Sequence, residues 1–483
     1  MAIPVTTDNQ SIQRGFMILA GWELLSYTRI TRQVVYSLNF WIPIRKELSM
    51  FNINNRDYIS VGIDVGSTFS FMSIVDSNGN IILKPFKILH NSIDSLERTI
   101  SAIKKAEESY SMKSRIFLES TGIYHFPLFC FLNESGFEAH IINPLITYSI
   151  KNSGIRKVKN DKLDSISIAR LGLSNNLKTS VLPFKLVLEL RSLVRKYYDI
   201  MDQRSAHINR LKADLHTVFP QYLDIFSDVC GSTSRMILKN YGTPDKILRA
   251  HKSSLIEKIS KSSRRGVSKS TECYEKLLNA ATSAKTFGCN IDSVYFNISI
   301  TIDLIEYLDT IIESILNQIK LLADEHKSEK FIKQVHLLDS ISGIGFLSAV
   351  TLMCEIGDFN AFNTPKQLFA YFGMDPGVNQ SGKFNATEMH MSKRGSRIAR
   401  RVIFSIALSN IRSTGNGKAI NPYLQAYYRK KAESKPKKVA IGAVMHKICN
   451  IIFAVLRDEK TFELRSPETH IINYRQSSQL LVA

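Results

Sequence analysis

The stretch VGIDVGSTFSFMSIVD, residues 61–76, decides the fold of the first regular part of the chain. Apolar and β-branched residues run from 59 to 65 and again from 69 to 75, a composition that is typical of β-strands. An Asn-Gly pair follows at 78–79 and is a strong signal for a hairpin turn, after which a third strand begins at Ile81. This opening therefore predicts three consecutive strands, with Asp64 at the end of the first.

Working outward from the hairpin, helices alternate with strands. Apolar residues at three- and four-residue steps predict helices over 92–110, 124–133 and 161–171, and short apolar runs predict strands over 115–119 and 137–142. A strand meander followed by strand–helix units is the order of an α/β RNase H-like domain of the RuvC type. The actin and sugar-kinase group begins in the same way, with a phosphate loop where GIDVGST stands. That group also needs a second phosphate loop and a Gly-rich adenosine site, which we do not find in the sequence.

Four acidic residues occupy positions at which this fold would bring side chains together. Asp64 ends the first strand, Glu119 ends the fourth, and Asp161 and Asp164 are three residues apart on a helix, where they share one face. Converging carboxylates repel one another unless divalent cations neutralise them, and hard oxygen ligands suit Mg²⁺ or Mn²⁺. Two such ions stabilise the attacking and leaving oxygens of phosphodiester chemistry. Taken singly, each acid also has a simpler interpretation as a turn residue, and Asp161 as a helix N-cap.

Composition narrows the partners of such a site. The 483 residues carry a formal net charge of +20, which favours a polyanion: DNA, RNA or an anionic membrane surface. The six cysteines are scattered without CxxC spacing, which fits a reducing cytosol and argues against a zinc site or a disulfide scaffold. The apolar stretches at 16–25 and 34–44 are shorter than the roughly 18–20 residues that span a bilayer, so we expect no membrane partner.

The chain divides into four regions by its patterns. Residues 1–57 do not fit the first domain, and we interpret them as a poorly integrated extension, with 1–49 translated from a start assigned too far upstream. Long amphipathic helices over 186–219 and 292–323 flank a mixed segment with a basic loop, which suggests an antiparallel coiled coil or bundle that assembles protomers. The predicted regions are the extension 1–57, a RuvC-like catalytic domain 58–180, a helical coiled-coil region with an insert 181–330, and a mainly α C-terminal domain with a basic tail 331–483.

The C-terminal region carries features that predict contact with nucleic acid. SISGIGFLSAVTL, residues 340–352, has the form of a helix-hairpin-helix element, in which Gly343 and Gly345 permit a tight turn whose N–H groups face a phosphate. In MDPGVNQSGKFN, residues 374–385, Ser381 stands beside a flexible glycine and Lys383, and a serine in this setting can attack phosphate. A basic helix predicted over 393–412 presents cations with no acid among them, and Arg forks fit phosphates; its cations are Lys393, Arg394, Arg397, Arg400 and Arg401.

These motifs together resemble the Insertion Sequence 110 family of transposases, whose members join a DEDD RuvC-like domain to a C-terminal transposase domain. The resemblance covers about residues 58–172 and 336–415. Beside residues 61–76 it is carried by FLESTGIYHFPLFCFL, INPLITYSI, RKVKNDKLDSISIARL, LLDSISGIGFLSAVTLMCEIGDFNAF and FAYFGMDPGVNQSGKFNATEMHMSKRGSRIARR. The sequence departs from the family pattern at Asn160, where Thr is usual, and at Ser342, where Pro is usual.

The resemblance implies a chemistry for the matched residues. The four family acids fall on Asp64, Glu119, Asp161 and Asp164, which would hold Mg²⁺ or Mn²⁺, and the family serine falls on Ser381, the nucleophile that links covalently to DNA. It further implies a structured guide RNA from the element itself, a homo-oligomer in which different protomers can supply the two halves of the site, and a prokaryotic cytoplasmic location at the nucleoid.

Two other functions remain open on the residues alone. A Holliday-junction nuclease of the RuvC type would use the same carboxylates with a water nucleophile, and its cleavage would survive the loss of Ser381. A catalytically inactive nucleic-acid-binding copy would bind without metal and break no strand. Steep salt dependence of binding is expected for all three, so it does not discriminate between them.

Overall fold

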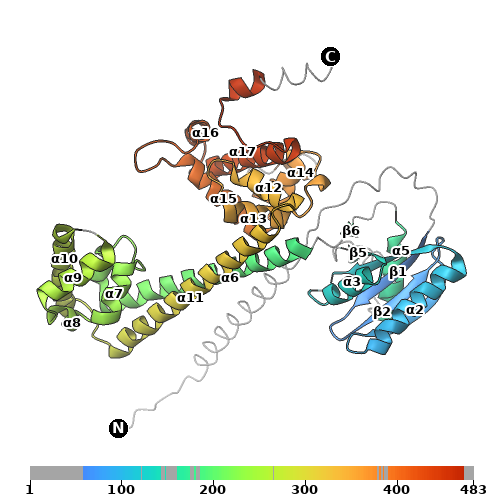
Figure 1. The fold of residues 1–483 in the computed structure, drawn as a ribbon, viewed down its shortest axis with the longest axis horizontal. Helices are drawn as coiled ribbons and strands as arrows, with labels where there is room; N and C mark the ends of the chain where they lie inside the picture. Colours follow the sequence, from blue (N-terminus) through green and yellow to red (C-terminus); the bar gives the residue numbers. More distant parts are fainter. Residues whose placement is uncertain are drawn as a thin grey trace, which may run out of the picture. The chain divides into compact units, whose positions relative to one another are not determined.

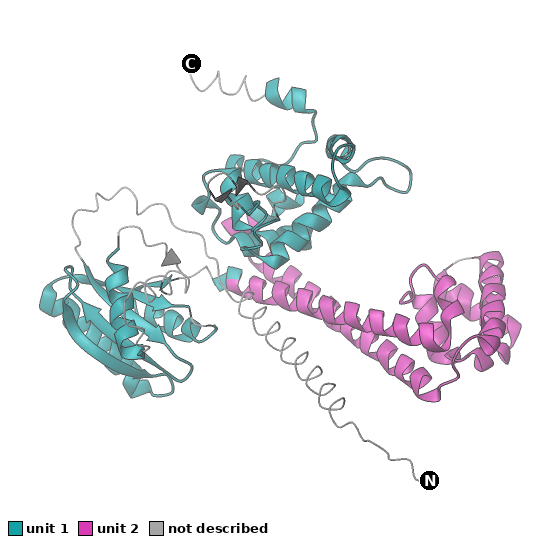
Figure 2. Ribbon diagram, turned by 180° about the vertical axis from the view of Figure 1, so that it is seen from behind, with its two compact units in different colours: residues 1–187, 334–483 teal, residues 188–333 magenta. Residues whose placement is uncertain are grey.

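The computed structural model describes most of the chain after the N-terminal extension. The chain forms two compact units, one of residues 1–187 with 334–483 and one of residues 188–333 (Figure 2). The predicted extension lies outside the described residues, as do Gly382 and Lys383. The described residues are 58–120, 122–142, 147, 160–174, 179–180, 185–264, 266–377, 380–381, 384–385 and 390–472.

A six-stranded mixed sheet forms the α/β part of the first unit (Figure 1). Its strands are β1 (Tyr58–Val65), β2 (Phe69–Val75), β3 (Ile81–Leu89), β4 (Lys113–Glu119), β5 (Glu138–Ile142) and β6 (Thr179–Ser180), in the order β3-β2-β1-β4-β5-β6. The strand β2 is antiparallel to β1 and β3, whereas β4 and β5 continue parallel to β1. This is the strand order and direction of an RNase H-like domain. The strand β3 continues past Pro85, which an edge strand tolerates because its outer N–H groups need no partner.

Helices cover both faces of this sheet, and the alternation of side chains along β1 decides which face meets which helix. Ile59 and Ile63 point into a core that they share with Ile103 of α2 (Ile93–Tyr110) and Phe129 of α3 (His125–Glu134). Residues at the even positions of β1 point the other way and contact α5 (Asp161–Gly172), as Ser60 does. The helices and strands predicted for this part of the chain are therefore confirmed, with ends shifted by one or two residues.

The second unit is helical. Two helices of 34 residues each, α6 (Lys185–Val218) and α11 (Asp292–Glu325), run side by side in both ribbon views (Figures 1 and 2). Between them in sequence lie η2 (Pro220–Asp224), α7 (Ser232–Tyr241), α8 (Pro244–Leu248), α9 (Lys252–Ser263) and α10 (Val267–Thr286). These shorter helices pack around the fully buried Tyr222. The two predicted long helices are present, while their coiled-coil packing stays a prediction.

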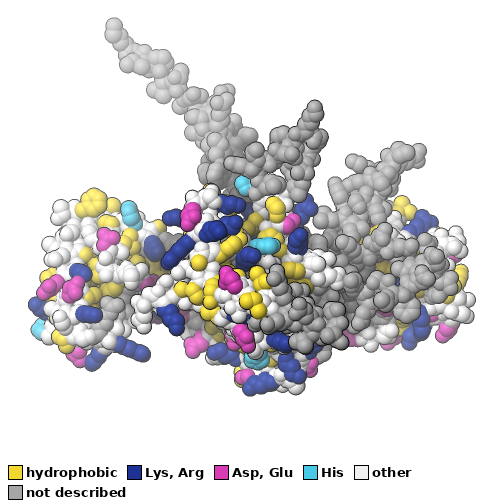
Figure 3. All heavy atoms as spheres, turned by 90° about the horizontal axis from the view of Figure 1, so that it is seen from above, with side chains coloured by type: hydrophobic (Ala, Val, Ile, Leu, Met, Phe, Trp, Pro, Cys, Tyr) yellow, Lys and Arg dark blue, Asp and Glu magenta, His cyan; other side chains and the backbone are white. Residues whose placement is uncertain are grey.

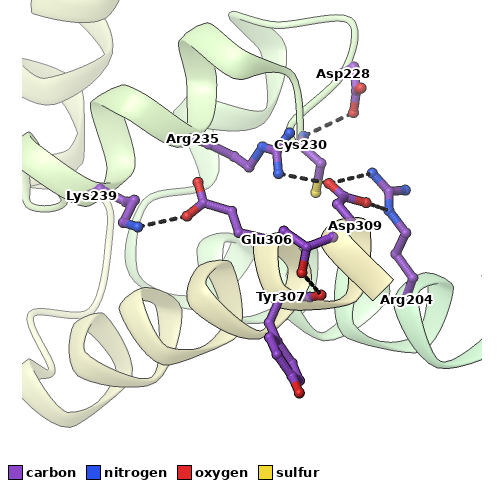
Figure 4. A network of polar contacts seen from close by, with 9 residues as sticks. Arg204, Asp228, Cys230, Arg235, Lys239, Glu306, Tyr307 and Asp309 are labelled. Carbon is purple, nitrogen blue, oxygen red and sulfur yellow. Dashed lines mark hydrogen bonds and ion pairs between the residues drawn. The ribbon is translucent and has the colours of Figure 1, made fainter. Parts of the chain in front are cut away.

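A polar network joins three helices of the second unit (Figure 4). Asp309 of α11 accepts hydrogen bonds from Arg204 Nε of α6 at 2.5 Å and from Arg235 Nη1 of α7 at 2.9 Å. One turn or two earlier on α11, Lys239 of α7 pairs with Asp303 and Glu306 at 2.8 and 2.7 Å. Ion pairs therefore connect α11 to both α6 and α7.

The C-terminal part of the first unit is mainly helical. Its elements are α12 (Lys330–Asp339), α13 (Phe346–Ile356), η3 (Phe359–Ala361), α14 (Pro365–Tyr371), β7 (Gln380–Ser381), β8 (Phe384–Asn385), α15 (Arg397–Ile411), α16 (Pro422–Ala432) and α17 (Lys437–Asp458). Within the described residues α17 is the one helix long and apolar enough to cross a membrane by length and composition. It packs against α14, α15 and α16, which is the environment of a core helix.

The basic helix predicted from residue 393 begins four residues later, at Arg397. Ser396 is its N-cap, since its hydroxyl accepts a hydrogen bond from Ala399 N at 3.1 Å. Lys393 has φ +54°, a left-handed conformation that a helix interior does not accept. Lys393 and Arg394 therefore belong to the segment before the helix.

Candidate active site

The position of α5 on the sheet is set by hydrogen bonds from β1. Tyr58 donates its hydroxyl to Gly172 O at 2.9 Å, and Ser60 donates to Ala169 O at 2.6 Å. A step of two residues toward the carboxyl end of β1 thus matches about one turn toward the amino end of α5. The first turn of α5 is in this way directed to the end of β1 where Asp64 stands.

Two glycines allow the helix to lie directly on the strand. A Cβ at Gly62 would overlap Ala169 N and Ser165 O of α5, and a Cβ at Gly172 would overlap the ring of Phe117 and the Ser60 hydroxyl. Ser60 and Gly62 therefore both face α5, and Asp64 is the next residue on the same face of β1.

The carboxylates come from three neighbouring elements. Ile63 of β1 pairs with Leu118 of β4 in parallel, so Asp64 and Glu119 each follow directly at the ends of adjacent strands. Across β1 on the other side, Asp64 pairs with Phe71 of β2, and the ammonium of Lys162 lies 5.8 Å from the Phe71 ring centroid. The first turn of α5, which carries Asp161 and Asp164, is thereby placed beside the Asp64 position.

Local structure separates the roles of the residues at the start of α5. The N-cap is Asn160, whose side chain accepts a hydrogen bond from Lys162 N at 3.1 Å. The simpler interpretation of Asp161 as the helix N-cap is therefore wrong, because Asn160, a good capping residue, fills that position. Asp164 is buried with 8% of its surface exposed, while Asp161 is exposed.

The donor set fits a hard divalent cation in chemistry, with four carboxylates and no sulfur or imidazole among the predicted ligands. Within the described residues, no three His, Cys, Asp or Glu side chains stand close enough together to hold a metal ion. The elements that carry the four carboxylates are neighbours in the sheet domain. Their role as metal ligands stays a prediction.

The predicted serine lies on a β-hairpin of the C-terminal part rather than in an irregular loop. Ser381 of β7 pairs with Phe384 of β8, with two residues between them. Further down, Gly377 N donates to His390 O at 2.8 Å, Ser392 N to Asp375 O at 2.8 Å, and Lys393 N to Gly373 O at 2.9 Å. We call the described residues between 373 and 395 the serine hairpin: residues 373–377 and 390–395 form its paired base, and Ser381 lies on the short pair β7–β8 between them in sequence.

Arg400 contacts the base of the serine hairpin. Its Nη1 donates to Phe372 O at 2.9 Å and to Gly395 O at 2.7 Å, so one guanidinium nitrogen joins the residues at the two feet. Burial, together with the neighbouring charge of Arg397, lowers the pKa of Arg400. Arg397 is exposed at the surface, as are Lys393 and Arg394, and Arg401 is half-buried.

The turn between α12 and α13 contains the two predicted glycines. Gly343 has φ +81°, and a Cβ there would overlap the Asn410 side chain of α15. Gly345 is the N-cap residue of α13, and as a glycine it leaves the first N–H groups of this helix without a side-chain partner at the cap. The turn thus has a packing reason for Gly343, while contact of this helix-hairpin-helix candidate with DNA stays a prediction.

Sequence reasoning missed the structural partners of the site. Gly62 stands two residues before Asp64 in a β-branched run, and a glycine at such a position is the sequence signal of a close helix crossing. Asn160 precedes the helical pattern directly, which is the signal for an N-cap. The role of Arg400 left no local signal, because its partners are backbone carbonyls.

Comparison with known families agrees with this architecture. The transposase model of the DEDD IS110 type matches residues 61–220, and the model described as "Transposase IS116/IS110/IS902 family" matches residues 335–429. The first match contains all four acids and the second contains Ser381 and the arginines. Fold and matches define the class: the chain is a DNA transposase or site-specific recombinase, an enzyme that cleaves and rejoins DNA. It belongs to the IS110 family of transposases.

Individual relatives span different shares of the chain. An insertion element IS110 protein of 43.6 kDa from Streptomyces coelicolor is 22% identical over 315 residues, which is 64% of this chain and 74% of that protein. A pilin gene-inverting protein from Moraxella bovis is 32% identical over 132 residues, 27% of this chain and 39% of that protein. Thermus thermophilus RuvC covers 25% of this chain at 11% identity with a TM-score of 0.18. The RNase H-like fold follows from the strand order and the strand directions.

Proposed function

We propose that this transposase cuts DNA with Ser381 as the nucleophile and with a divalent cation held by Asp64, Glu119, Asp161 and Asp164. The single observation that supports it is the register of α5 on β1, which directs two carboxylates of the helix to the ends of two parallel strands. The set of donors favours Mg²⁺ or Mn²⁺.

The proposed step is a transesterification. Ser381 Oγ forms a bond to phosphorus while the bond from phosphorus to one deoxyribose oxygen breaks, and that oxygen leaves with the proton of the serine hydroxyl. The cation, when bound, supplies charge stabilisation for the developing oxyanions. The phosphoserine ester keeps the energy of the broken bond, so a second deoxyribose hydroxyl can reverse the step and rejoin the DNA.

Nucleic acid would be held by the cations of the C-terminal part. Lys393, Arg394, Arg397 and Arg401 are the proposed phosphate contacts, with Lys383 and the turn at Gly343 and Gly345 as further ones. Figure 3 shows Lys and Arg side chains at the surface, with acidic side chains among them. A structured guide RNA and a homo-oligomer formed through the long helices complete the proposal, with the protein in the cytoplasm beside the nucleoid.

A covalent-trapping assay tests the proposal. Full-length protein is mixed with Mg²⁺, labelled DNA from the ends of the element and RNA transcribed from its flanks, and the mixture is run on a denaturing gel. We expect a labelled protein band that disappears in Ser381→Ala and in Asp64→Asn. Cleaved DNA without a protein band, unchanged in Ser381→Ala, would instead identify a nuclease with a water nucleophile.

A further inference from the structure

The serine hairpin is tied to the rest of the C-terminal part by a small number of contacts at its base. Phe372 directly precedes the hairpin and Gly395 is its last residue, and the carbonyls of both accept hydrogen bonds from Arg400 Nη1. Because a single guanidinium nitrogen serves both carbonyls, the separation of the two feet is tied to the position of Arg400 on α15. We propose that Arg400 is a positioning residue that sets the placement of Ser381, rather than a phosphate contact; this rests on the proposed role of Ser381.

Close backbone packing at the same place leaves little freedom to the feet. A Cβ at Gly395 would overlap Tyr371 O and Gly373 N, and Gly373 has φ +67°. The feet therefore touch backbone to backbone, an approach that only glycines permit. A change in the arginine contact would be transmitted to both strands together, since neither can move without displacing the other.

A second contact joins the arms one step nearer to the tip. Ser392 Oγ donates to Asp375 Oδ1 at 2.5 Å, and Ser392 N donates to Asp375 O at 2.8 Å. The base of the hairpin thus carries side-chain and main-chain bonds in series from Arg400 toward β7. A serine nucleophile gains from such support, because a misplacement of about 1 Å can lower a rate by on the order of 10²-fold.

A phosphate contact and a positioning residue differ in what their loss changes. Loss of a phosphate contact lowers the affinity for DNA and reduces the slope of log K against log salt by about 0.9. Loss of a positioning residue leaves affinity and slope unchanged and lowers the yield of covalent adduct even when all protein is bound. Arg400 and Arg397 lie in the first turn of the same helix, so they form a matched pair for this comparison.

The experiment uses full-length Arg400→Gln, Arg397→Gln and Arg412→Gln proteins with the labelled element-end DNA. Arg412 is the C-cap that directly follows the same helix, and its variant controls for the loss of one charge. We expect Arg400→Gln to keep the native affinity and salt slope while its adduct yield at saturating DNA falls by on the order of 10²-fold. Arg397→Gln should lose affinity and slope and recover its adduct yield at saturation. Arg400→Gln behaving as expected for Arg397→Gln would overturn the proposal.

Two further measurements keep the outcome decisive. If Arg400→Gln fails to fold, Ser392→Ala removes the second contact without a change of charge, and we expect it to lower the adduct yield in the same direction. Hydrogen exchange at the amides of Gly377, Ser392 and Lys393 should accelerate in Arg400→Gln and not in Arg412→Gln. If native protein forms no adduct, the proposed role of Ser381 fails, but hydrogen exchange still tests whether Arg400 holds the base of the serine hairpin. Exchange rates that are the same in Arg400→Gln and in native protein would refute the positioning role of Arg400.

Discussion

At the scale of single residues, the absence of a side chain at Gly62 matters as much as the carboxylate two residues later. Its missing Cβ lets α5 rest on β1, and the helix then carries Asp161 and Asp164 toward Asp64. The residues that position the site are therefore distinct from those that would perform the chemistry.

Replacing Gly62 by Ala should destabilise the α/β part by about 3 kcal/mol, the upper end of the range for overpacking, because the new methyl meets backbone atoms rather than a flexible side chain. The free energy of unfolding in urea measures this. Gly415→Ala is the matched control, since nothing lies within 4 Å of a Cβ there. Equal stability of both variants would contradict the close crossing.

A second residue-scale prediction concerns Glu138, at the start of β5. The hydrogen bond with His140 Nε2 at 3.0 Å, supported by Arg115 at 3.3 Å, holds the pKa of the Glu138 carboxyl below its usual range. A carboxyl whose folded pKa is lowered adds stability above its unfolded pKa, roughly 4.3, and loses it as the pH falls through the folded value.

Glu138→Gln should accordingly lower the melting temperature at pH 7 and approach the native protein as the pH falls below about 4. Because the side chain is half-exposed, we expect a small difference, and thermal unfolding at several pH values in parallel would show it. A gap between the two proteins that widens toward acid pH would refute this ion pair as the cause.

At the scale of elements, Asp309 joins α11 to two other helices. The hydrogen bond to Asp309 raises the pKa of Arg204, so the contact favours the charged form of the arginine. Removing this carboxylate leaves two partly buried guanidinium groups without their shared partner. The cost lies between that of an exposed pair and that of a buried one, about 1–2 kcal/mol.

We expect Asp309→Asn to speed hydrogen exchange in α6 and α7 and to lower the unfolding free energy by this amount. Glu257→Gln removes a fully exposed i,i+4 pair with Lys261 and serves as the control with almost no effect. If the two variants have the same unfolding free energy and the same exchange rates, the polar network in Figure 4 does not stabilise the packing of α11 against α6 and α7.

Elements also show what the sequence could and could not predict. Short runs of apolar and β-branched residues predicted the strands of the sheet domain, and period-3.6 patterns predicted its helices and both 34-residue helices. The helices α7, α8, α9 and α10 were not separated in the mixed insert. The first three are short and interrupted by Gly, Pro and Ser, and the 20-residue α10 begins inside the stretch predicted as a basic loop. The strand β6 has two residues, too few for any pattern, and the pairing of β7 with β8 depends on contacts that a turn-rich sequence does not reveal.

The candidate site divides in the same manner. The four acids and Ser381 could be picked from motif and order, because each stands at an element end or beside glycine. The separate role of Arg400 could not be predicted, since Arg400 shares a helical face with Arg397 and yet turns its Nη1 to backbone carbonyls. Spacing gives the face of a helix, but a tertiary partner decides what the side chain does.

At the scale of the whole molecule, the charge of +20 should appear as salt-sensitive binding of DNA. The last turn of α16 carries Arg429 and Lys430, both exposed. Changing both to Gln should lower the salt slope for duplex DNA by about 1.8, which is about 0.9 for each lost phosphate contact. Fluorescence anisotropy over a range of salt concentrations measures the slope.

The control is a double change of Lys104 and Lys105 to Gln on α2, which removes the same charge from another exposed surface. An equal loss of slope in both double variants would mean that net charge alone governs binding. A loss confined to the α16 variant would assign the contact to that helix.

The close contact of β1 with α5, which Gly62 and Gly172 permit, affects how intact copies of such genes can be recognised. Copies of mobile elements accumulate mutations without selection, and a survey that counts only the four acids and the serine would score many of them as intact. A single methyl at position 62 or 172 leaves all five in place and still disturbs the contact that brings the first turn of α5 toward Asp64. A survey of genomic copies should therefore check these two glycines, together with the four acids and the serine, before it scores a copy as able to transpose.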